Sequence, residues 1–192
     1  MSLAARLAVI VLFQTLVLVT MIALKQHTLN TGTLVVLETE PVDPRSLFSG
    51  DYVRLNYSIS TLRLDKVGGD RDFKIHDPAY VVLRAGDPYW QPVAVYHQMP
   101  SMAAGQVAIR GEVQYSGEFL WNPDTRKSEK IPHLSLRYGI ENYYVPEGEG
   151  RALERPVPGE TVSLRVAVDK AGVAGIKAVL VNGRERYVES LW

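Results

Sequence analysis

The chain opens with an unbroken apolar segment and then alternates between apolar and polar positions. Residues 7–24, LAVIVLFQTLVLVTMIAL, carry no charge and lie between Arg6 and Lys25. At ~1.5 Å per residue, a helix of this length is just long enough to cross a hydrocarbon core of ~30 Å. A buried core helix would show a polar stripe, and a cleaved signal peptide would have a shorter apolar region ending at a small-x-small site. The pattern therefore predicts an uncleaved membrane anchor over residues 1–25.

Beyond residue 30, short alternating segments are separated by Gly, Pro, Asp and Asn, which is typical of β-strands joined by turns. The expected strands are TLVVLE (33–38), YVRLNYSI (52–59), YVVLR (80–84), PVAVYH (92–97), QVAIRGEVQY (106–115), GEFLW (117–121), HLSLRY (133–138), ENYYV (141–145), TVSLRVAVD (161–169), GIKAVLVN (175–182) and RYVES (186–190). Asn182-Gly183 is the strongest hairpin signal, because both residues tolerate positive φ. The fold class is therefore mainly β: an N-terminal transmembrane helix, a linker at 26–32, and one antiparallel β-sandwich or barrel-like domain over 33–192.

The stretch GDYVRLNYS, residues 50–58, starts a strand abruptly after a predicted turn. Alternation puts Val53, Leu55, Tyr57 and Ile59 on the core face of that strand. The Asp51 carboxylate can accept backbone N–H groups from the preceding turn and so fasten turn to strand. The alternative is that Arg45, Asp51 and Tyr52 are displayed together as a binding surface.

The same stretch resembles the signature of the GDYXXLXY protein family. The matching positions are Gly50, Asp51, Tyr52, Leu55 and Tyr57. The upstream PVDPRSLFSGD and the later RYGIENYYVPEGEGRALE, residues 137–154, also look like shared blocks of that family. The resemblance implies a bacterial, membrane-associated protein with a single domain after its anchor. It implies no activity, and it gives no catalytic residue to carry over.

The later block combines paired tyrosines with alternating charges. Tyr143, Tyr144, Glu147 and Arg151 could bind a charged ligand or a peptide terminus, since loops on a β scaffold commonly carry such surfaces. The alternative is a solvated loop whose charges pair with one another. Paired carboxylates such as Glu147 and Glu149 could also perform acid/base chemistry. The alternative function is therefore a hydrolase that acts on an envelope polymer or peptide through Asp51 or Glu147.

Composition argues against several other classes of function and site. The formal net charge is zero, which disfavours a nucleic-acid binder, and the chain has no cysteine, which excludes disulfides, thiol nucleophiles and thiolate zinc sites. The four histidines show no metal-binding spacing. We therefore predict no metal, no cofactor and no nucleic-acid partner.

Serine chemistry is an alternative, because an anchor followed by a β domain is also the layout of signal peptidases, which use a Ser-Lys dyad. Ser101 is the nearest match to such a nucleophile, but some 75 residues separate it from the anchor. The lysines available as its base are Lys127, Lys130, Lys170 and Lys177. A remote signal-peptidase-like enzyme stays an alternative only, and no catalytic residue is assigned.

These observations favour a single-pass protein of the bacterial inner membrane. We expect residues 7–24 to contact the lipid bilayer, the N-terminus to lie in the cytoplasm and the β domain to lie outside it. The expected role is a binding or assembly module for another envelope protein. Aromatic residues that could dock such a partner, unless they are core, are Tyr89, Trp90, Trp121, Tyr143 and Tyr144.

Overall fold

The computed structural model describes residues 2–40, 52–122, 126–144 and 159–189. One long helix, α1 (Leu3–Thr31), is followed by thirteen strands in the described part of the chain. The strands are β1 (Thr33–Glu40), β2 (Tyr52–Arg54), β3 (Asn56–Tyr57), β4 (Thr61–Arg63), β5 (Gly68–Gly69), β6 (Pro78–Arg84), β7 (Gln91–Tyr96), β8 (Gln106–Asn122), β9 (Lys127–Arg137), β10 (Asn142–Tyr144), β11 (Val162–Val168), β12 (Ala174–Val181) and β13 (Arg184–Val188). The predicted fold class, a long apolar helix followed by a mainly β region, is confirmed.

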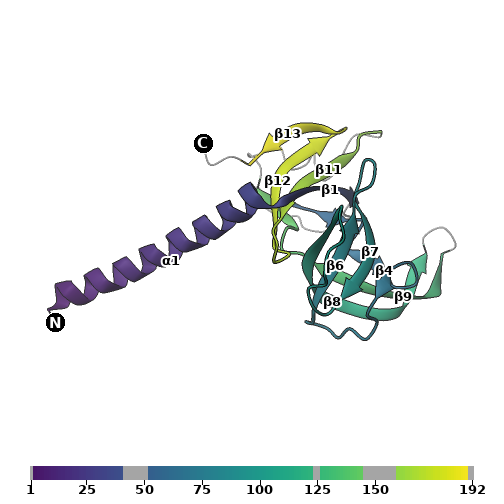
Figure 1. Cartoon of the computed structure of the whole chain (residues 1–192), viewed down its shortest axis with the longest axis horizontal. Helices are drawn as coiled ribbons and strands as arrows, with labels where there is room; N and C mark the ends of the chain where they lie inside the picture. The colour runs from purple at the N-terminus through teal and green to yellow at the C-terminus, as the bar shows by residue number, and fades with distance from the viewer. Residues whose placement is uncertain (1, 41–51, 123–125, 145–158, 190–192) are drawn as a thin grey trace.

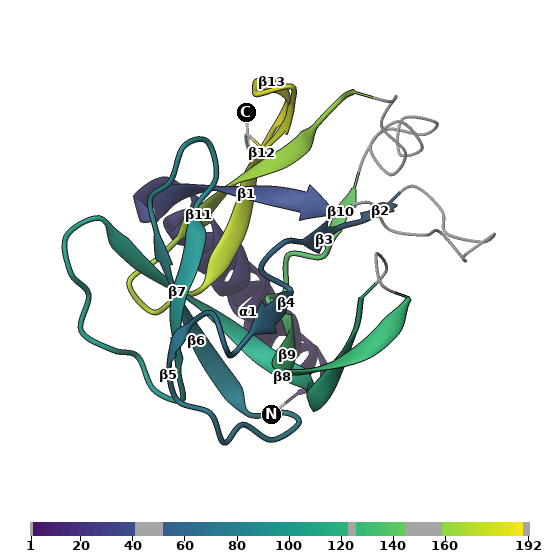
Figure 2. The same ribbon diagram turned by 90° about the vertical axis from the view of Figure 1, so that its right-hand side faces the viewer.

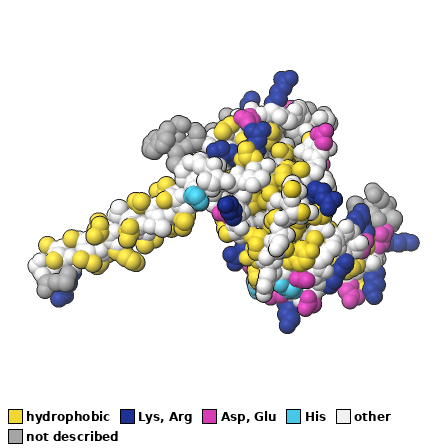
Figure 3. Space-filling model, viewed as in Figure 1, with side chains coloured by type: hydrophobic (Ala, Val, Ile, Leu, Met, Phe, Trp, Pro, Cys, Tyr) yellow, Lys and Arg dark blue, Asp and Glu magenta, His cyan; other side chains and the backbone are white. Residues whose placement is uncertain are grey.

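The helix projects away from the β region (Figure 1). Its visible surface is covered by hydrophobic side chains, and the charged side chains gather at its N-terminal end and on the β region (Figure 3). None of its most apolar stretch is buried against the rest of the chain, and the helix is long and apolar enough to cross a membrane. Such a helix is consistent with a signal anchor or a signal sequence.

The segment 26–32, expected as a linker, is helical as far as Thr31. Gly32 ends the helix by donating its N–H to the carbonyl of Thr28, and β1 begins at the next residue. The Thr28 hydroxyl, on a residue only 5% exposed, donates to Asp169 Oδ2 at 2.8 Å. The last turn of the helix is therefore attached to the β region rather than separated from it by a flexible segment.

Two large sheets and one small one form the β region (Figure 2). The first has the order β13-β12-β11-β1-β3, and the second has the order β4-β9-β8-β6-β7-β5. A two-stranded sheet pairs β10 with β2. Within the described residues, the strand pairs are antiparallel except β5 with β7, which is parallel. One cluster of buried apolar side chains draws on both large sheets, with Val35, Leu164 and Val179 from the first and Val81, Ile109 and Leu134 from the second.

Most of the expected strands are present, with three differences. The expected strand 52–59 is broken into β2 and β3, because at Leu55 the backbone N–H turns to the carbonyl of Glu141. The segments expected at 106–115 and 117–121 form one strand, β8, which absorbs the break through register shifts. The short strands β4 and β5 carry too few residues to show alternation, so the pattern missed them.

The hairpin at Asn182-Gly183 is confirmed. These two residues connect β12 to β13 with φ angles of 52° and 74°, the positive values that a type I′ turn requires. The predicted core face of the motif strand is also confirmed where side chains are described: Leu55, Tyr57 and Ile59 are 6%, 0% and 1% exposed.

Candidate functional site

The GDYXXLXY-like segment and the later block lie side by side. Strand β10 pairs with β2 in antiparallel register, so that Tyr144 lies opposite Tyr52 and Asn142 opposite Arg54. The N–H of Leu55 then donates to the carbonyl of Glu141 at 2.7 Å. Two segments that are far apart in the sequence are thus joined through their backbones.

Two buried tyrosines fix this junction from opposite sides. Tyr57, in the motif, donates its hydroxyl to the carbonyl of Ile140 at 2.5 Å, and Tyr138, in the later block, donates to the carbonyl of Ile59 at 2.7 Å. Burial raises the pKa of both phenols, with a further contribution from the negative charge of Glu141. Both hydroxyls therefore stay protonated and act as donors, which makes them structural groups rather than bases.

The loop held by these tyrosines forms one wall of an open groove of about 610 Å³. The other walls come from the start of β6, the middle of β8 and the start of β12, so the groove lies where the two large sheets meet. The residues lining it are His76, Pro78, Arg110, Gly111, Glu112, Arg137, Tyr138, Gly139, Glu141, Asn142, Val173 and Ala174.

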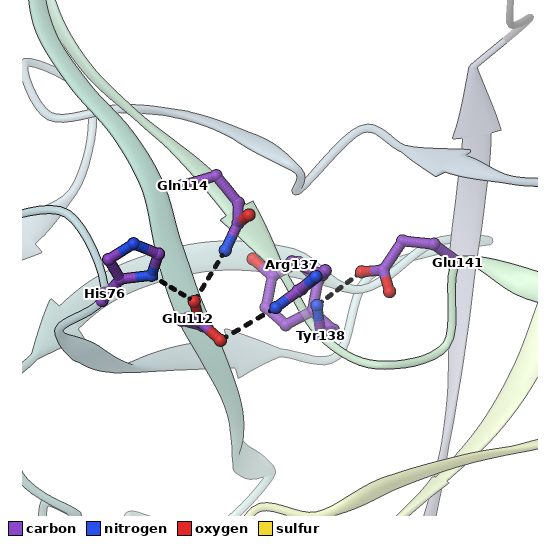
Figure 4. Close-up of polar contacts among 6 residues, drawn as sticks. All are labelled: His76, Glu112, Gln114, Arg137, Tyr138 and Glu141. Carbon is purple, nitrogen blue, oxygen red and sulfur yellow. Dashed lines mark hydrogen bonds and ion pairs between the residues drawn. The ribbon is translucent and has the colours of Figure 1, made fainter.

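Glu112 is the centre of the polar contacts in this groove (Figure 4). Its carboxylate contacts His76 Nδ1 at 2.7 Å, accepts from Gln114 Nε2 at 3.1 Å and pairs with Arg137 at 3.0 Å. The bonds from His76, Arg137 and Gln114 lower the pKa of Glu112 to about 2. A carboxyl group that is ionised so firmly is a poor general acid near neutral pH, so Glu112 serves to order its neighbours.

Glu141, on the opposite wall, also orders the loop. Its Oε1 accepts the N–H of Tyr138 at 2.5 Å (Figure 4), while its backbone carbonyl accepts from Leu55. The groove is thus built by hydrogen bonds from both the motif strand and the later block.

A second feature lies on the side of the β region remote from α1, where β8 and β9 extend as a hairpin (Figure 1). Strand β6 pairs with β8 only as far as Glu112, and β4 pairs with β9 only from His133 onward. Among the described residues, 118–122 and 127–131 therefore form strand pairs only with each other. We call these two segments the β8–β9 arm.

The β8–β9 arm exposes two large aromatic side chains. Phe119 and Trp121 are 60% and 59% exposed, and neither belongs to the core. They are two residues apart with no register shift between them, so they share one face of β8. This is a small aromatic surface on a projecting support.

The comparison with protein families agrees with the resemblance in the sequence. The model of the GDYXXLXY protein family matches residues 14–179. The chain belongs to the GDYXXLXY family. The match extends through the second half of the apolar helix, the motif strand and all the strands up to β12, so the groove and the β8–β9 arm both lie within the family's shared region. No curated protein and no solved structure matches the chain.

Several residues singled out from the sequence lie outside the described residues: Arg45, Gly50, Asp51, Glu147 and Arg151. Tyr52 is described only through its backbone, opposite Tyr144.

The paired tyrosines that follow separate into two roles. Tyr144 is 77% exposed, whereas Tyr143 is 7% exposed and supports the core. Burial and the neighbouring carboxylate of Glu189, which also accepts a hydrogen bond from it, raise the pKa of Tyr143 to about 12. In this family member, Leu55 and Tyr57 position the loop that forms the groove, and Tyr144 faces solvent beside the motif strand.

The structure also places the residues of the Ser-Lys alternative. Ser101 lies in the exposed segment before β8, whereas Lys127 and Lys130 lie on β9, beside the far end of β8 in the β8–β9 arm. No hydrogen bond joins Ser101 to a lysine in the described part of the chain. The four histidines lie in separate environments, and the described residues contain no group of three that could hold a metal ion.

The groove has no signature in the sequence. His76, Glu112 and Arg137 come from three separate segments, and no local spacing joins them. Trp121 was named as an aromatic that could dock a partner, and its exposure shows that it is not a core residue.

Proposed function

We propose that this GDYXXLXY protein is a membrane-anchored binding or assembly module that docks another protein of the cell envelope through the β8–β9 arm. The observation that supports the proposal is the pair Phe119 and Trp121, about three-fifths exposed on an arm whose described residues contribute no side chain to the core. Aromatic side chains, and tryptophan above all, dominate the energetics of protein interfaces when a partner covers them.

The aromatic face suits docking better than the arm's edges do. Adding a partner strand at an edge requires a flat, regular strand, and edge lysines and bulges discourage it. The register of β8 shifts between Gly117 and Phe119, and the neighbouring strand carries Lys127 and Lys130. Lys130 Nζ lies 3.6 Å from Glu118 Oε2, in an exposed ion pair that contributes little to stability. We therefore expect contact through Phe119 and Trp121 rather than strand addition.

In this proposal, the N-terminal anchor holds the β region at the membrane. Residues 7–24 span the bilayer in this proposal, the N-terminus is cytoplasmic and the β region lies outside the cytoplasm. Holding the β region at the membrane raises its effective concentration for membrane-bound partners. The surface proposed from the sequence remains part of the module: Arg45, Asp51, Tyr52, Tyr144, Glu147 and Arg151. Among these, Tyr144 is described as an exposed side chain.

The rival function is a hydrolase of an envelope polymer or peptide that uses Asp51 or Glu147. An enzyme of this kind would lose turnover on Asp51→Asn or Glu147→Gln while staying folded. A binding module would lose its partner on Trp121→Ser and would have no turnover to lose.

The test is site-specific photocrosslinking in native membranes. A photoreactive phenylalanine analogue is placed at position 119, at 121, or at the control position Val188, which is 52% exposed on β13. We expect one membrane protein to be crosslinked from both arm positions and not from 188. The purified complex should also weaken at least tenfold on Trp121→Ser, since a buried interface tryptophan contributes roughly 2 kcal/mol or more.

Two results would contradict the proposal. One is equal crosslinking from position 188 and from the arm. The other is an adduct of twice the chain's own mass, which would make the arm a contact between two copies of this protein.

A further inference from the structure

The hairpin that joins β11 to β12 lies beside the end of the helix. Thr28 bonds Asp169 at the start of this hairpin, and a Cβ placed on Gly175 at its other end would lie 2.9 Å from Leu29 Cδ2 and 3.2 Å from Lys25 Nζ. The hairpin is on the α1 side of the β region (Figure 1). It is therefore level with helix residues 25–29.

This level corresponds to the lipid headgroups if the helix spans a membrane. The uncharged segment ends at residue 24, and residues 25–29 rise only about 6 Å further along the axis at ~1.5 Å per residue. The headgroup layer on each side of a bilayer is about 5–7 Å thick. Since no flexible linker intervenes between α1 and β1, the hairpin cannot move far from the surface.

The hairpin forms one wall of the groove described above, through Val173 and Ala174. It is tied to the facing wall by the N–H of Arg110, which donates to the carbonyl of Gly172 at 2.8 Å. The Val173 side chain is 47% exposed and is therefore free to contact the upper part of lipid chains. The groove thus adjoins the membrane surface.

The groove contains one cation without a partner of its own. Glu112 is satisfied by its three neighbours, and one of them, Arg137, has its charge neutralised by it. Within the described residues, the guanidinium of Arg110 forms no ion pair and no hydrogen bond. Lys25 and Lys170, near the two ends of the hairpin, likewise form no ion pair there and are exposed.

We propose that this groove is a phospholipid headgroup site, in which the guanidinium of Arg110 binds the phosphate while Val173 contacts the acyl boundary. The proposal rests on the membrane span of the proposed function. A guanidinium offers a planar set of donors that matches phosphate oxygens, and Lys25 and Lys170 add attraction for the lipid surface. The same chemistry would bind a free phosphate ester, but the position of the hairpin favours the bilayer as the source.

The test uses the full-length protein purified in a mild detergent and titrated with phosphatidylglycerol, with bound lipid counted by native mass spectrometry. We expect Arg110→Gln to weaken lipid binding on the order of tenfold, the effect of losing one charge-assisted contact. The matched control is Arg84→Gln. Arg84 is also exposed, but it lies at the end of β6 remote from Pro78 and the groove, so its substitution should leave binding unchanged.

Glycerol 3-phosphate, added in place of the lipid, separates the two sources. Binding of the lipid alone, with loss only in Arg110→Gln, supports the headgroup site. Binding of glycerol 3-phosphate as tightly as the lipid would overturn the lipid as the source of the phosphate. Equal lipid binding by the unmodified protein, Arg110→Gln and Arg84→Gln would overturn the site.

Alkaline carbonate extraction of native membranes tests the anchor separately. If the protein stays in the membrane on extraction and the Arg110→Gln variant still binds lipid as the unmodified protein does, only the headgroup site is contradicted. Protein that is released contradicts the anchor itself.

Discussion

Among single residues, tyrosine hydroxyls and a glutamate carboxylate form the hydrogen bonds that join the motif strand to the later block. Tyr57 and Tyr138 each donate to a carbonyl in the other's segment, and Glu141 accepts from the backbone of Tyr138. Buried carbonyls need such partners, because an unsatisfied buried polar group costs more than a hydrogen bond gains. The tyrosine that closes the GDYXXLXY motif is therefore explained as a structural donor.

Replacing Tyr57 with phenylalanine should lower the free energy of unfolding by roughly 1–3 kcal/mol, because the carbonyl of Ile140 loses its partner in a site without water access. Urea unfolding of the full-length protein in detergent measures the change. Tyr115→Phe is the control, since Tyr115 is 52% exposed and its change should stay within about 0.5 kcal/mol. Similar losses in both variants would show that the buried hydroxyl is not a structural donor.

The Glu112 carboxyl should titrate at a pH near 2 in the folded protein. Its pKa lies below the ordinary value of 4.5, so its contribution to stability is complete above 4.5 and is lost as the pH falls from there toward 2. Because the group is exposed to solvent, NMR of the labelled carboxyl carbon is a better measurement than unfolding.

Substituting the groups that contact Glu112 tests the cause of this low pKa. His76→Ala should raise the Glu112 midpoint toward its ordinary value, since the bond from His76 is the largest contribution. Lys130→Ala, on the remote arm, should leave it unchanged. If the titration midpoint of Glu112 is unchanged in His76→Ala, the contact between the two side chains does not persist in solution.

At the scale of secondary-structure elements, the junction between α1 and β1 determines how the helix is held. The strand begins two residues after the helix ends, and Gly32 fits where backbone atoms come close: a Cβ there would lie 2.7 Å from the carbonyl oxygen of Thr28 and 2.9 Å from the nitrogen of Val168. Backbone atoms cannot move aside as a flexible side chain can. The junction therefore behaves as a rigid corner rather than as a linker.

Gly32→Ala should weaken the attachment of the helix to the β region by about 1–3 kcal/mol, the usual cost of overpacking. Hydrogen exchange of residues 25–31 and 168–175 in the full-length protein should accelerate. Gly175→Ala is the matched control, because its new methyl would meet only the ends of the Leu29 and Lys25 side chains, which can move. Faster exchange in the control than in Gly32→Ala would contradict a rigid corner at residue 32.

Across the whole molecule, the apolar helix lies at one end of the long axis and the β8–β9 arm at the far side of the β region (Figure 1), and the groove is formed within the β region. This order suits a protein that is fixed at one end and makes contact at the other. The groove and the exposed aromatic pair would then serve different ligands.

The orientation of the chain is open to a direct test, because the chain contains no cysteine. Single cysteines are introduced as Ala4→Cys, near the start of α1, and Ser101→Cys, in the exposed segment before β8. A membrane-impermeant maleimide should label position 101 in cells whose inner membrane is intact, and position 4 only after permeabilisation. The reverse pattern would place the β region in the cytoplasm, and a chain that lacks its first residues would indicate a cleaved signal.

Features that depend on neighbours along the chain can be predicted from the amino-acid sequence. The apolar run over 7–24 gave the helix, period-two alternation gave most strands, and Asn182-Gly183 gave a hairpin whose backbone angles the structure confirms. The motif and the later block identified the family. Each of these features is determined by local sterics and the local hydrophobic pattern, so a short stretch of sequence is enough to predict it.

How those elements combine into sites depends on contacts between residues far apart in the sequence. The groove needs His76, Glu112 and Arg137 from three segments, and the role of Tyr57 depends on a carbonyl 83 residues away. The exposure of Trp121 follows from where β6 and β4 stop pairing, which alternation along β8 does not reveal. Long-range pairing and burial are set by the packing of the whole chain, and for that reason the candidate sites became visible only in three dimensions.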